Sequence, residues 1–314
     1  MEEKKRGQHY VWRYYLTSWA DDSGTLFCLR DNHIFPTNPK NIAKARDFYR
    51  LRELSQHEIA IIEQVFIKDY WSKPIQQLNK NWVKMFTSVF TAREHLKSTG
   101  ALDDKKEAQL DVVINNLVED FHSRIEDENL PHLDSLKNGN VDFLSGKIEK
   151  HEFMFFLCLQ YFRTNMIRNN VLRSFASGSR SISPSLIQNV WSVLYFILAT
   201  NLAYSLSSDD SYRALILKNT SPLPFITGDQ PVINTRTDYS NYEQATDLEL
   251  YYPISPSLAL LITDSNHGGD SHQTTVQIQE NEVAQYNKLI FDVSDEQIYA
   301  NNVNALNMFI KHTL

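Results

Sequence analysis

Glycine, proline and cysteine are scarce in this chain of 314 residues, which contains 9, 10 and 2 of them. Flexible linkers and low-complexity segments are rich in glycine and proline, so we expect a compact fold without long linkers. No block of roughly 20 to 50 residues recurs, which argues against a repeat architecture. Cys28 and Cys158 lie far apart in apolar stretches and lack Cys-x-x-Cys spacing. We therefore predict two buried free thiols in a reducing cytoplasm.

Positive charge is also in deficit, because the formal net charge is −7. An acidic chain lacks the global basic field of most avid nucleic-acid binders, so contact with nucleic acid would need a local patch. The strongest apolar run, residues 190–206, contains Ser192, Thr200, Asn201 and Ser205 and is shorter than the ~20 residues that span a bilayer. We interpret it as a buried core helix. The charged N-terminus lacks the apolar stretch of a secretory signal, so we expect a cytoplasmic protein with no membrane partner.

Several catalytic signatures are missing from the sequence. It has no Gly-x-Gly-x-x-Gly, no P-loop, no Gly-x-Ser-x-Gly and no His-Glu-x-x-His. Their absence disfavours the usual dinucleotide and nucleoside-triphosphate enzymes, the nucleophile-elbow hydrolases and the zinc proteases. The segment HGGDSH, residues 267–272, looks like a metal site at first sight, but its composition is typical of a surface loop.

Apolar periodicity predicts helices through the first two-thirds of the chain. Residues 24–30 are expected to form a strand, and a helical pattern runs from 42 to about 96 with Ser55 as an N-cap. Further helices are predicted at residues 75–96, 105–128, 147–173 and 186–206. We interpret the charged face of 105–128 as solvated and residues 131–146 as a polar break.

The last third has short β-branched and aromatic runs between Pro, Gly, Asn and Asp, starting near residues 212, 224, 230, 248, 257 and 274. Helices are predicted at 280–289 and 303–312. The fold class is therefore α+β, a predominantly helical body with a small antiparallel or mixed sheet from the C-terminal third. We predict a single domain, 1–314, with its helical body at about 40–206 and its β-rich part at about 212–280 plus the strand at 24–30.

One predicted helix carries more polar residues than packing needs. At about 100° per residue, Glu152, Gln160 and Arg163 of helix 147–173 share a face. A guanidinium and an amide on one face can hold a phosphate or carboxylate, and Arg168, Arg173 and Arg180 extend the positive charge. The alternative is that these groups form structural ion pairs at the surface.

Two other polar residues are candidates. Asp229 follows a predicted strand and precedes Gln230 and Pro231, where an acid could serve as a base or metal ligand, or could simply bond its own turn. His9 lies in the aromatic segment QHYVWRYYLTSWA, residues 8–20, and could act as an acid, base or ligand. The alternative for His9 is a polar plug in an aromatic core.

Four motifs occur in order along the chain: HYVWRYYLTSWA (9–20), QYFRT (160–164), FITGDQPV (225–232) and YPISP (252–256). Together they resemble the motifs of DUF4238, a large bacterial family of unknown function. Trp12, Trp19 and Gly228 stand where the family pattern has Pro, Phe and Ser. Loss of the proline favours a continuous helix through residues 10–19, and loss of the serine weakens any chemistry that needs its hydroxyl beside Asp229. The resemblance implies a bacterial, cytoplasmic protein, but no agreed reaction.

The polar members of these motifs suggest three hypotheses. The first is a nucleic-acid- or nucleotide-directed hydrolase, nuclease-like or phosphodiesterase-like, acting as a toxin or phage-defence effector. Its predicted catalytic residues are His9, Asp229 and Arg163, with Asp229 orienting His9 or holding a divalent metal. Its predicted substrate-binding residues are Tyr10, Arg13, Gln160, Thr164 and Arg168. The second is a non-catalytic interaction module fixed by a buried polar network, and the third is a sensor of a small anionic ligand.

Overall fold

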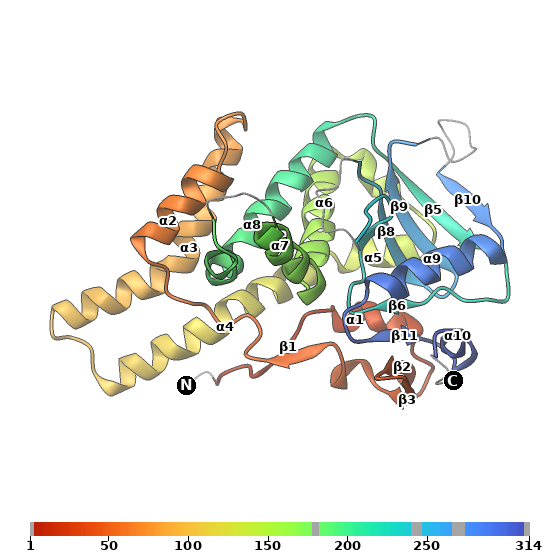
Figure 1. Ribbon diagram of the computed structural model, residues 1–314, viewed down its shortest axis with the longest axis horizontal. Coiled ribbons are helices and arrows are strands. Elements are labelled where there is room, and N and C mark those ends of the chain that lie inside the picture. Colours follow the sequence, from red (N-terminus) through yellow and green to blue (C-terminus); the bar gives the residue numbers. More distant parts are fainter. Residues whose placement is uncertain (1–2, 178–181, 240–246, 266–273, 311–314) are drawn as a thin grey trace.

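The computed structural model describes residues 3–177, 182–239, 247–265 and 274–310 (Figure 1). Helices and strands combine in an α+β fold, as the sequence predicts. Arg180, the segment 267–272 and the last two residues of the helix predicted at 303–312 lie outside the described residues. That helix is shorter than predicted, because α10 (Asn304–Asn307) is followed by a turn at residues 308–309.

Helices form most of the body. Their bounds are α2 (Gln56–Ile61), α3 (Lys73–Ser98), α4 (Asp104–Glu128), α5 (Leu130–Lys137), α6 (Lys147–Phe162), α7 (Asn165–Ser177) and α8 (Pro184–Ser208). Ser55 caps α2 in a capping box with Glu58, which confirms the predicted start of that helix. Pro184 stands in the first turn of α8, where its missing N–H costs nothing. The α3–α4 hairpin projects at the left of the view (Figure 1).

The helix predictions fail in three places. Residues 42–54 contain the short strand β4 (Lys44–Arg46) and extended chain, and α5 lies within the predicted polar break. The helix predicted at 147–173 is two helices, because α6 ends at Phe162 and α7 begins at Asn165. Glu152 is exposed near the start of α6, so it does not share a site with Arg163, which is buried beyond the other end of the helix.

The N-terminal segment is not a continuous helix. Its backbone forms β1 (Gly7–His9), the short helix α1 (Arg13–Leu16) and a 3-10 turn (Thr17–Trp19). Strand β1 pairs antiparallel with β4, so that His9 faces Lys44 in the register. The predicted apolar stripe is buried as expected, since Trp12, Tyr15, Leu16 and Trp19 are each at most 6% exposed.

The strands of the described residues form three sheets. The largest has the strand order β10-β5-β9-β8-β7, and it is antiparallel except for the parallel β10–β5 pair. The second is antiparallel with the order β3-β2-β11-β6, and the third is the β1–β4 ribbon. The remaining bounds are β2 (Leu26–Arg30), β3 (His33–Thr37), β5 (Arg213–Asn219), β6 (Thr227–Gly228), β7 (Ile233–Asn234), β8 (Leu250–Ser255), β9 (Leu258–Thr263), β10 (Thr275–Ile278), α9 (Glu280–Val293), β11 (Ile298–Ala300) and α10 (Asn304–Asn307).

The five-stranded sheet is buried on both faces. Successive side chains of β8 alternate between two apolar clusters, with Leu250 and Tyr252 facing the helical body and Tyr251 facing α9. Tyr251 stacks on Tyr286 of α9, with the ring centroids 4.4 Å apart. Cys28 and Cys158 are both buried free thiols, as predicted. The sheet is therefore a central layer between α9 and the helical body (Figure 1).

Helix α8 is the core helix that the sequence predicts. Among the described residues it alone has the length and composition to cross a membrane, and 61% of its most apolar window is buried inside the protein. Core helices of soluble proteins pass the same test of length and composition. Trp191, Tyr195 and Phe196 of this helix pack against the helical body.

Candidate functional site

The break between α6 and α7 places Arg163 in the interior. Arg163 is only 1% exposed, and its Nε donates to the Tyr10 carbonyl oxygen at 2.9 Å. Its Nη1 donates to Glu126 Oε1 at 2.7 Å in a buried ion pair. Burial alone would lower the pKa of Arg163, but Tyr49 and Glu126 outweigh it, so the pKa is raised and the guanidinium stays charged. Its Nη2 has no hydrogen-bond partner within the part of the chain that the structure describes.

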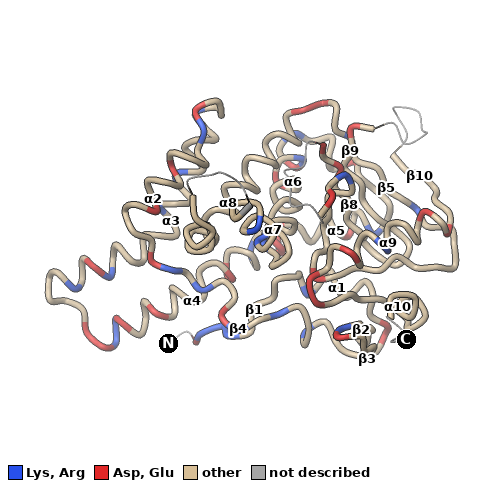
Figure 2. The backbone as a smooth tube through the Cα atoms, viewed as in Figure 1, with Lys and Arg blue, Asp and Glu red and all other residues tan. Residues whose placement is uncertain are grey.

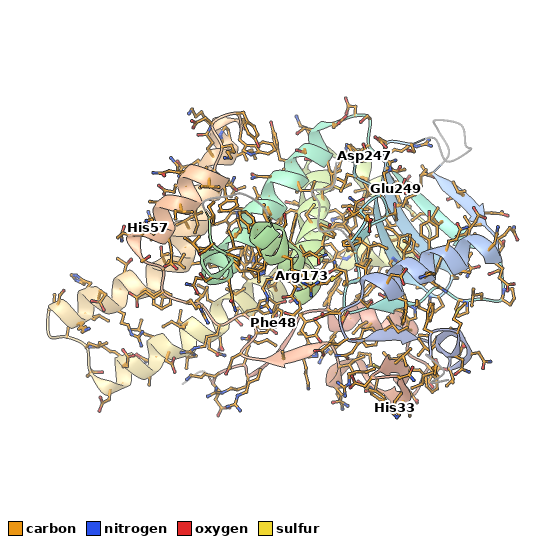
Figure 3. All side chains as sticks on the ribbon, in the orientation of Figure 1. His33, Phe48, His57, Arg173, Asp247 and Glu249 are labelled. Atoms are coloured by element: carbon orange, nitrogen blue, oxygen red, sulfur yellow. The ribbon has the colours of Figure 1, made fainter. Side chains whose placement is uncertain are left out.

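Arg163 lines a cavity of about 410 Å³, which we call the arginine pocket. Arg50, Arg52, Arg163 and Arg168 line it together with Thr164 and Ser192. Figure 2 shows basic residues on α7 and on the segment that leads into α2, and the labelled Phe48 in Figure 3 is another lining residue. Its volume is in the range of small-molecule sites, roughly 300 to 1,000 Å³. The arginine pocket can therefore hold an anion of modest size.

The arginines of this pocket differ in how they are engaged. Arg50 pairs with Asp111, and Arg52 donates to Asn189 Oδ1 at 2.7 Å. Arg168 is half-buried and its side chain makes no hydrogen bond within the described residues, and burial lowers its pKa against the opposing charge of Asp295. The Ser192 hydroxyl, which also lines the pocket, has no partner there either. Arg168, Ser192 and Nη2 of Arg163 are thus three donors that a ligand could engage.

His9 lines a second cavity of about 390 Å³, which we call the histidine pocket. The ring bonds to the backbone of Lys40, while Nε2 is buried without a partner among the described residues. Burial, together with the nearby charges of Lys44, Arg13 and Arg163, lowers the pKa of His9 to about 4. His9 is therefore neutral at physiological pH, with Nε2 available as an acceptor or base.

Glu119 of α4 shares the histidine pocket with His9. Its carboxylate accepts the backbone N–H of His9, while Oε2 is buried without a partner within the described residues. Burial raises the pKa of Glu119 to about 7, and the charge of Arg163 opposes that rise. An acid with a pKa near neutrality can donate or accept a proton at physiological pH.

Asp229 is committed to the backbone. Oδ1 accepts the N–H of Asp295 at 2.8 Å, and Oδ2 accepts those of Glu296 at 2.7 Å and Gln297 at 2.9 Å. Burial raises the pKa of Asp229 to about 7, although the three N–H donors favour the ionised form. Asp229 lines neither pocket, so the structure does not place it beside His9. A side chain at Gly228 would collide with Ser294, which occupies that space.

The other predicted site residues are divided among these regions. Thr164 lines the arginine pocket and donates from its hydroxyl to the Gln230 side chain. Gln160 is buried near the end of α6 and lines neither pocket. Arg13 is exposed at the histidine pocket and makes no hydrogen bond or ion pair within the described residues.

Tyr10 connects Arg163 to the turn around Asp229. Its carbonyl accepts Arg163 Nε, and its hydroxyl accepts Gln297 Nε2 at 3.2 Å. Gln297 in turn donates its backbone N–H to Asp229. Tyr10, Arg163 and Asp229 thus belong to one hydrogen-bonded network, but the predicted site residues do not meet in one cavity.

A model of the family described as "Protein of unknown function (DUF4238)" matches residues 7–181 and 201–304. The chain belongs to the DUF4238 family. No curated protein and no solved structure matches it. The family resemblance seen in the sequence is thereby confirmed, and the functional assignment of this DUF4238 protein depends on the site itself.

The sequence analysis missed the acidic half of the histidine pocket. Glu119, His122 and Glu126 follow an i, i+3, i+7 spacing that places them on one face of α4. The interpretation of the charged face of this helix as solvated is wrong for these residues, since His122 is 2% exposed and the Glu126 side chain 13%. The occurrence of His and Glu in line with the apolar positions of this helix was the feature of the sequence that could have predicted their burial.

The two pockets of this DUF4238 protein share a wall. Arg163 lines the arginine pocket and pairs with Glu126, which lines the histidine pocket. A 2.8 Å hydrogen bond joins His122 Nε2 on the histidine side to the Tyr195 hydroxyl on the arginine side. Within the described residues no group of three or more His, Cys, Asp and Glu side chains is placed to hold a metal ion.

Proposed function

We propose that this DUF4238 protein is a phosphodiester hydrolase that acts on a nucleotide or nucleic acid and binds a phosphate of its substrate in the arginine pocket. The observation that carries the proposal is the buried Arg163 guanidinium, whose Nη2 lacks a partner among the described residues and lines a cavity with Arg168 and Ser192. A buried donor without a partner is costly, and a phosphate oxygen would satisfy it with a charge-assisted hydrogen bond.

The surrounding charge supports an anionic ligand. Four arginines and one acid, Asp47, line the arginine pocket, so the local field is positive although the chain carries a net charge of −7. Arg168 has no competing hydrogen bond within the described residues. A role as a cytoplasmic toxin or phage-defence effector in bacteria fits such a hydrolase and belongs to this proposal.

The binding test compares Arg168→Met and Ser192→Ala with Arg124→Met, a matched control in which an exposed arginine on α4 is changed. Affinity for single-stranded RNA, single-stranded DNA and a mononucleotide is measured by calorimetry at two salt concentrations. We expect Arg168→Met to weaken binding by about tenfold or more and to reduce its salt dependence, and we expect the control to do neither. Equal affinity in Arg168→Met and wild type would refute the assignment of the pocket.

A sensor of a small anionic ligand is the second candidate. It is favoured by the separation of the pockets, because the free Arg163 donor and the His9 base line different cavities. Such a sensor would show saturable thermal stabilisation by a nucleotide and no turnover. Degradation of RNA, DNA or a nucleotide by wild type, lost in His9→Ala, would decide for the hydrolase.

A further inference from the structure

The histidine pocket contains two buried polar atoms for which the described part of the chain supplies no hydrogen-bond partner. His9 Nε2 and Glu119 Oε2 both lack partners within the described residues, and both side chains line the same cavity. A ring nitrogen without a proton accepts a hydrogen bond, so His9 Nε2 requires a ligand with a donor such as a hydroxyl group, and a carboxyl group with a pKa of about 7 can accept or donate at Glu119 Oε2. The arginine pocket, by contrast, offers donors and requires acceptors.

Both side chains are held in position by the backbone. Strand β1 positions His9 through its pairing with β4, and the backbone of Lys40 lies against the ring. The Glu119 carboxyl group lies against the backbone N–H of His9. One ribbon therefore positions the imidazole and the carboxyl group relative to each other, as an acid–base pair requires.

Arg163 lies in the wall between the two pockets. Its side chain lines the arginine pocket and pairs with Glu126 of the histidine pocket. The exposed Arg13 at the histidine pocket gives a second, weaker position for a phosphate. A ligand with one phosphate at Arg13 and another in the arginine pocket carries several phosphates along a chain, as a nucleic-acid strand does.

We propose that His9 and Glu119 are the acid–base pair that cleaves single-stranded RNA in the histidine pocket, while a neighbouring phosphate of the strand occupies the arginine pocket. This inference rests on the proposed function and names its substrate class and a further catalytic residue, Glu119. RNA carries the donor that the pocket lacks, because each ribose has a 2′-hydroxyl group.

The reaction needs no group beyond the strand and these two side chains. His9 Nε2 takes the proton of a ribose 2′-hydroxyl, and the resulting oxygen attacks the adjacent phosphorus. The bond from phosphorus to the 5′-oxygen breaks, its electron pair stays on that oxygen, and Glu119 supplies the proton. The products are a 2′,3′-cyclic phosphate and a 5′-hydroxyl, and transfer of one proton from His9 to Glu119 through solvent restores the starting state.

The charges around the pair suit these roles. Lys44, Arg13 and Arg163 surround His9 and, together with burial, keep it neutral above a pKa of about 4. Arg163, Glu126 and Lys5 act on Glu119, which stays protonated below a pKa of about 7. Cleavage should therefore rise above pH 4 and fall as the pH passes 7.

The test uses Glu119→Gln and His9→Asn, with Glu128→Gln as the control because Glu128 is exposed on the same helix. Wild type and variants are incubated with a short single-stranded RNA, with the same strand carrying one 2′-deoxy position, and with DNA. We expect wild type and the control to leave 2′,3′-cyclic phosphate ends seen by mass spectrometry, and to spare the 2′-deoxy position and the DNA. Glu119→Gln and His9→Asn should lower kcat by about 100-fold or more, with KM nearly unchanged.

The outcomes separate this inference from the proposed function. Equal cleavage of DNA, 3′-hydroxyl products, or full kcat in Glu119→Gln would overturn the RNA mechanism. Absence of cleavage by wild type, with binding still lost in Arg168→Met, would overturn the mechanism and leave anion binding in the arginine pocket intact. Unchanged RNA binding in Arg168→Met would instead count against the proposed function, whatever the histidine pocket does.

Discussion

The turn around Asp229 and the two pockets beside Arg163 are both rich in buried polar groups, and they differ in how those groups are satisfied. Both oxygens of Asp229 accept backbone N–H groups. In the pockets, His9 Nε2, Glu119 Oε2 and Arg163 Nη2 have no partner within the described residues. Satisfied polar groups stabilise a fold, whereas unsatisfied groups that line a cavity indicate a ligand. We therefore assign a structural role to the turn around Asp229 and ligand binding to the two pockets.

The largest effect is expected from Asp229→Asn. The amide keeps the shape of the carboxylate but presents an NH₂ group to backbone N–H donors, so at least one buried donor loses its acceptor. We expect the free energy of unfolding to fall by about 3 kcal/mol in urea denaturation. Asp295→Asn, a change at an exposed position in the same loop, should leave it nearly unchanged. A stable Asp229→Asn protein that has lost RNA binding would show that this region takes part in recognition.

The contrast between these regions also shows what the sequence could predict. The α+β class, the Ser55 cap, the buried stripe from Trp12 to Trp19 and the buried thiols follow from local pattern. The candidate site does not, because its geometry depends on contacts between distant segments. Gln8, for example, donates to the Asn115 carbonyl, 107 residues away, and such contacts place His9 beside Glu119.

Arg163 illustrates the same limit. Its residue type and neighbours predicted a site that binds an anion. The helix predicted over residues 147–173, however, put Arg163 on the same face as Glu152. In the structure the helix is interrupted at Arg163 and Thr164. The Tyr10 carbonyl and Glu126 accept hydrogen bonds from two N–H groups of Arg163. Only the three-dimensional partners show that Nη2, with its two N–H groups, lacks a partner within the described residues and remains for a ligand.

Glu119→Gln should raise stability, in contrast to Asp229→Asn. The pKa of Glu119 is about 7 in the folded protein, against an ordinary value of 4.5, so ionisation favours unfolding as the pH rises from 4.5 through 7. At pH 8 the neutral glutamine should therefore raise the free energy of unfolding by about 2 kcal/mol, with almost no gain at pH 4. Urea denaturation at the two pH values measures this, with Glu128→Gln as the control. An equal gain at both pH values would contradict the raised pKa.

Thr164→Val tests the boundary between the two regions, because Thr164 lines the arginine pocket while its hydroxyl is engaged by Gln230. The valine has the same shape and leaves the buried Gln230 oxygen without that donor. We expect a loss of about 1 to 2 kcal/mol in the free energy of unfolding and little change in affinity for nucleotide or RNA. A variant that is as stable as wild type but binds nucleotide or RNA more weakly would show that Thr164 binds the ligand and does not stabilise the fold.

Arg168→Met is expected to have the smallest effect on stability among these variants and a large effect on binding. The Arg168 side chain makes no hydrogen bond within the described residues, and burial already lowers its pKa, so its charge does little for the fold. Arg168→Met keeps the apolar stem and should change the free energy of unfolding by less than about 0.5 kcal/mol. The same variant should lose at least about tenfold in affinity for RNA, because a phosphate loses a charge-assisted donor. Urea denaturation and calorimetry on one preparation measure both quantities. A variant that is strongly destabilised would place Arg168 with Asp229, among the residues that build the fold.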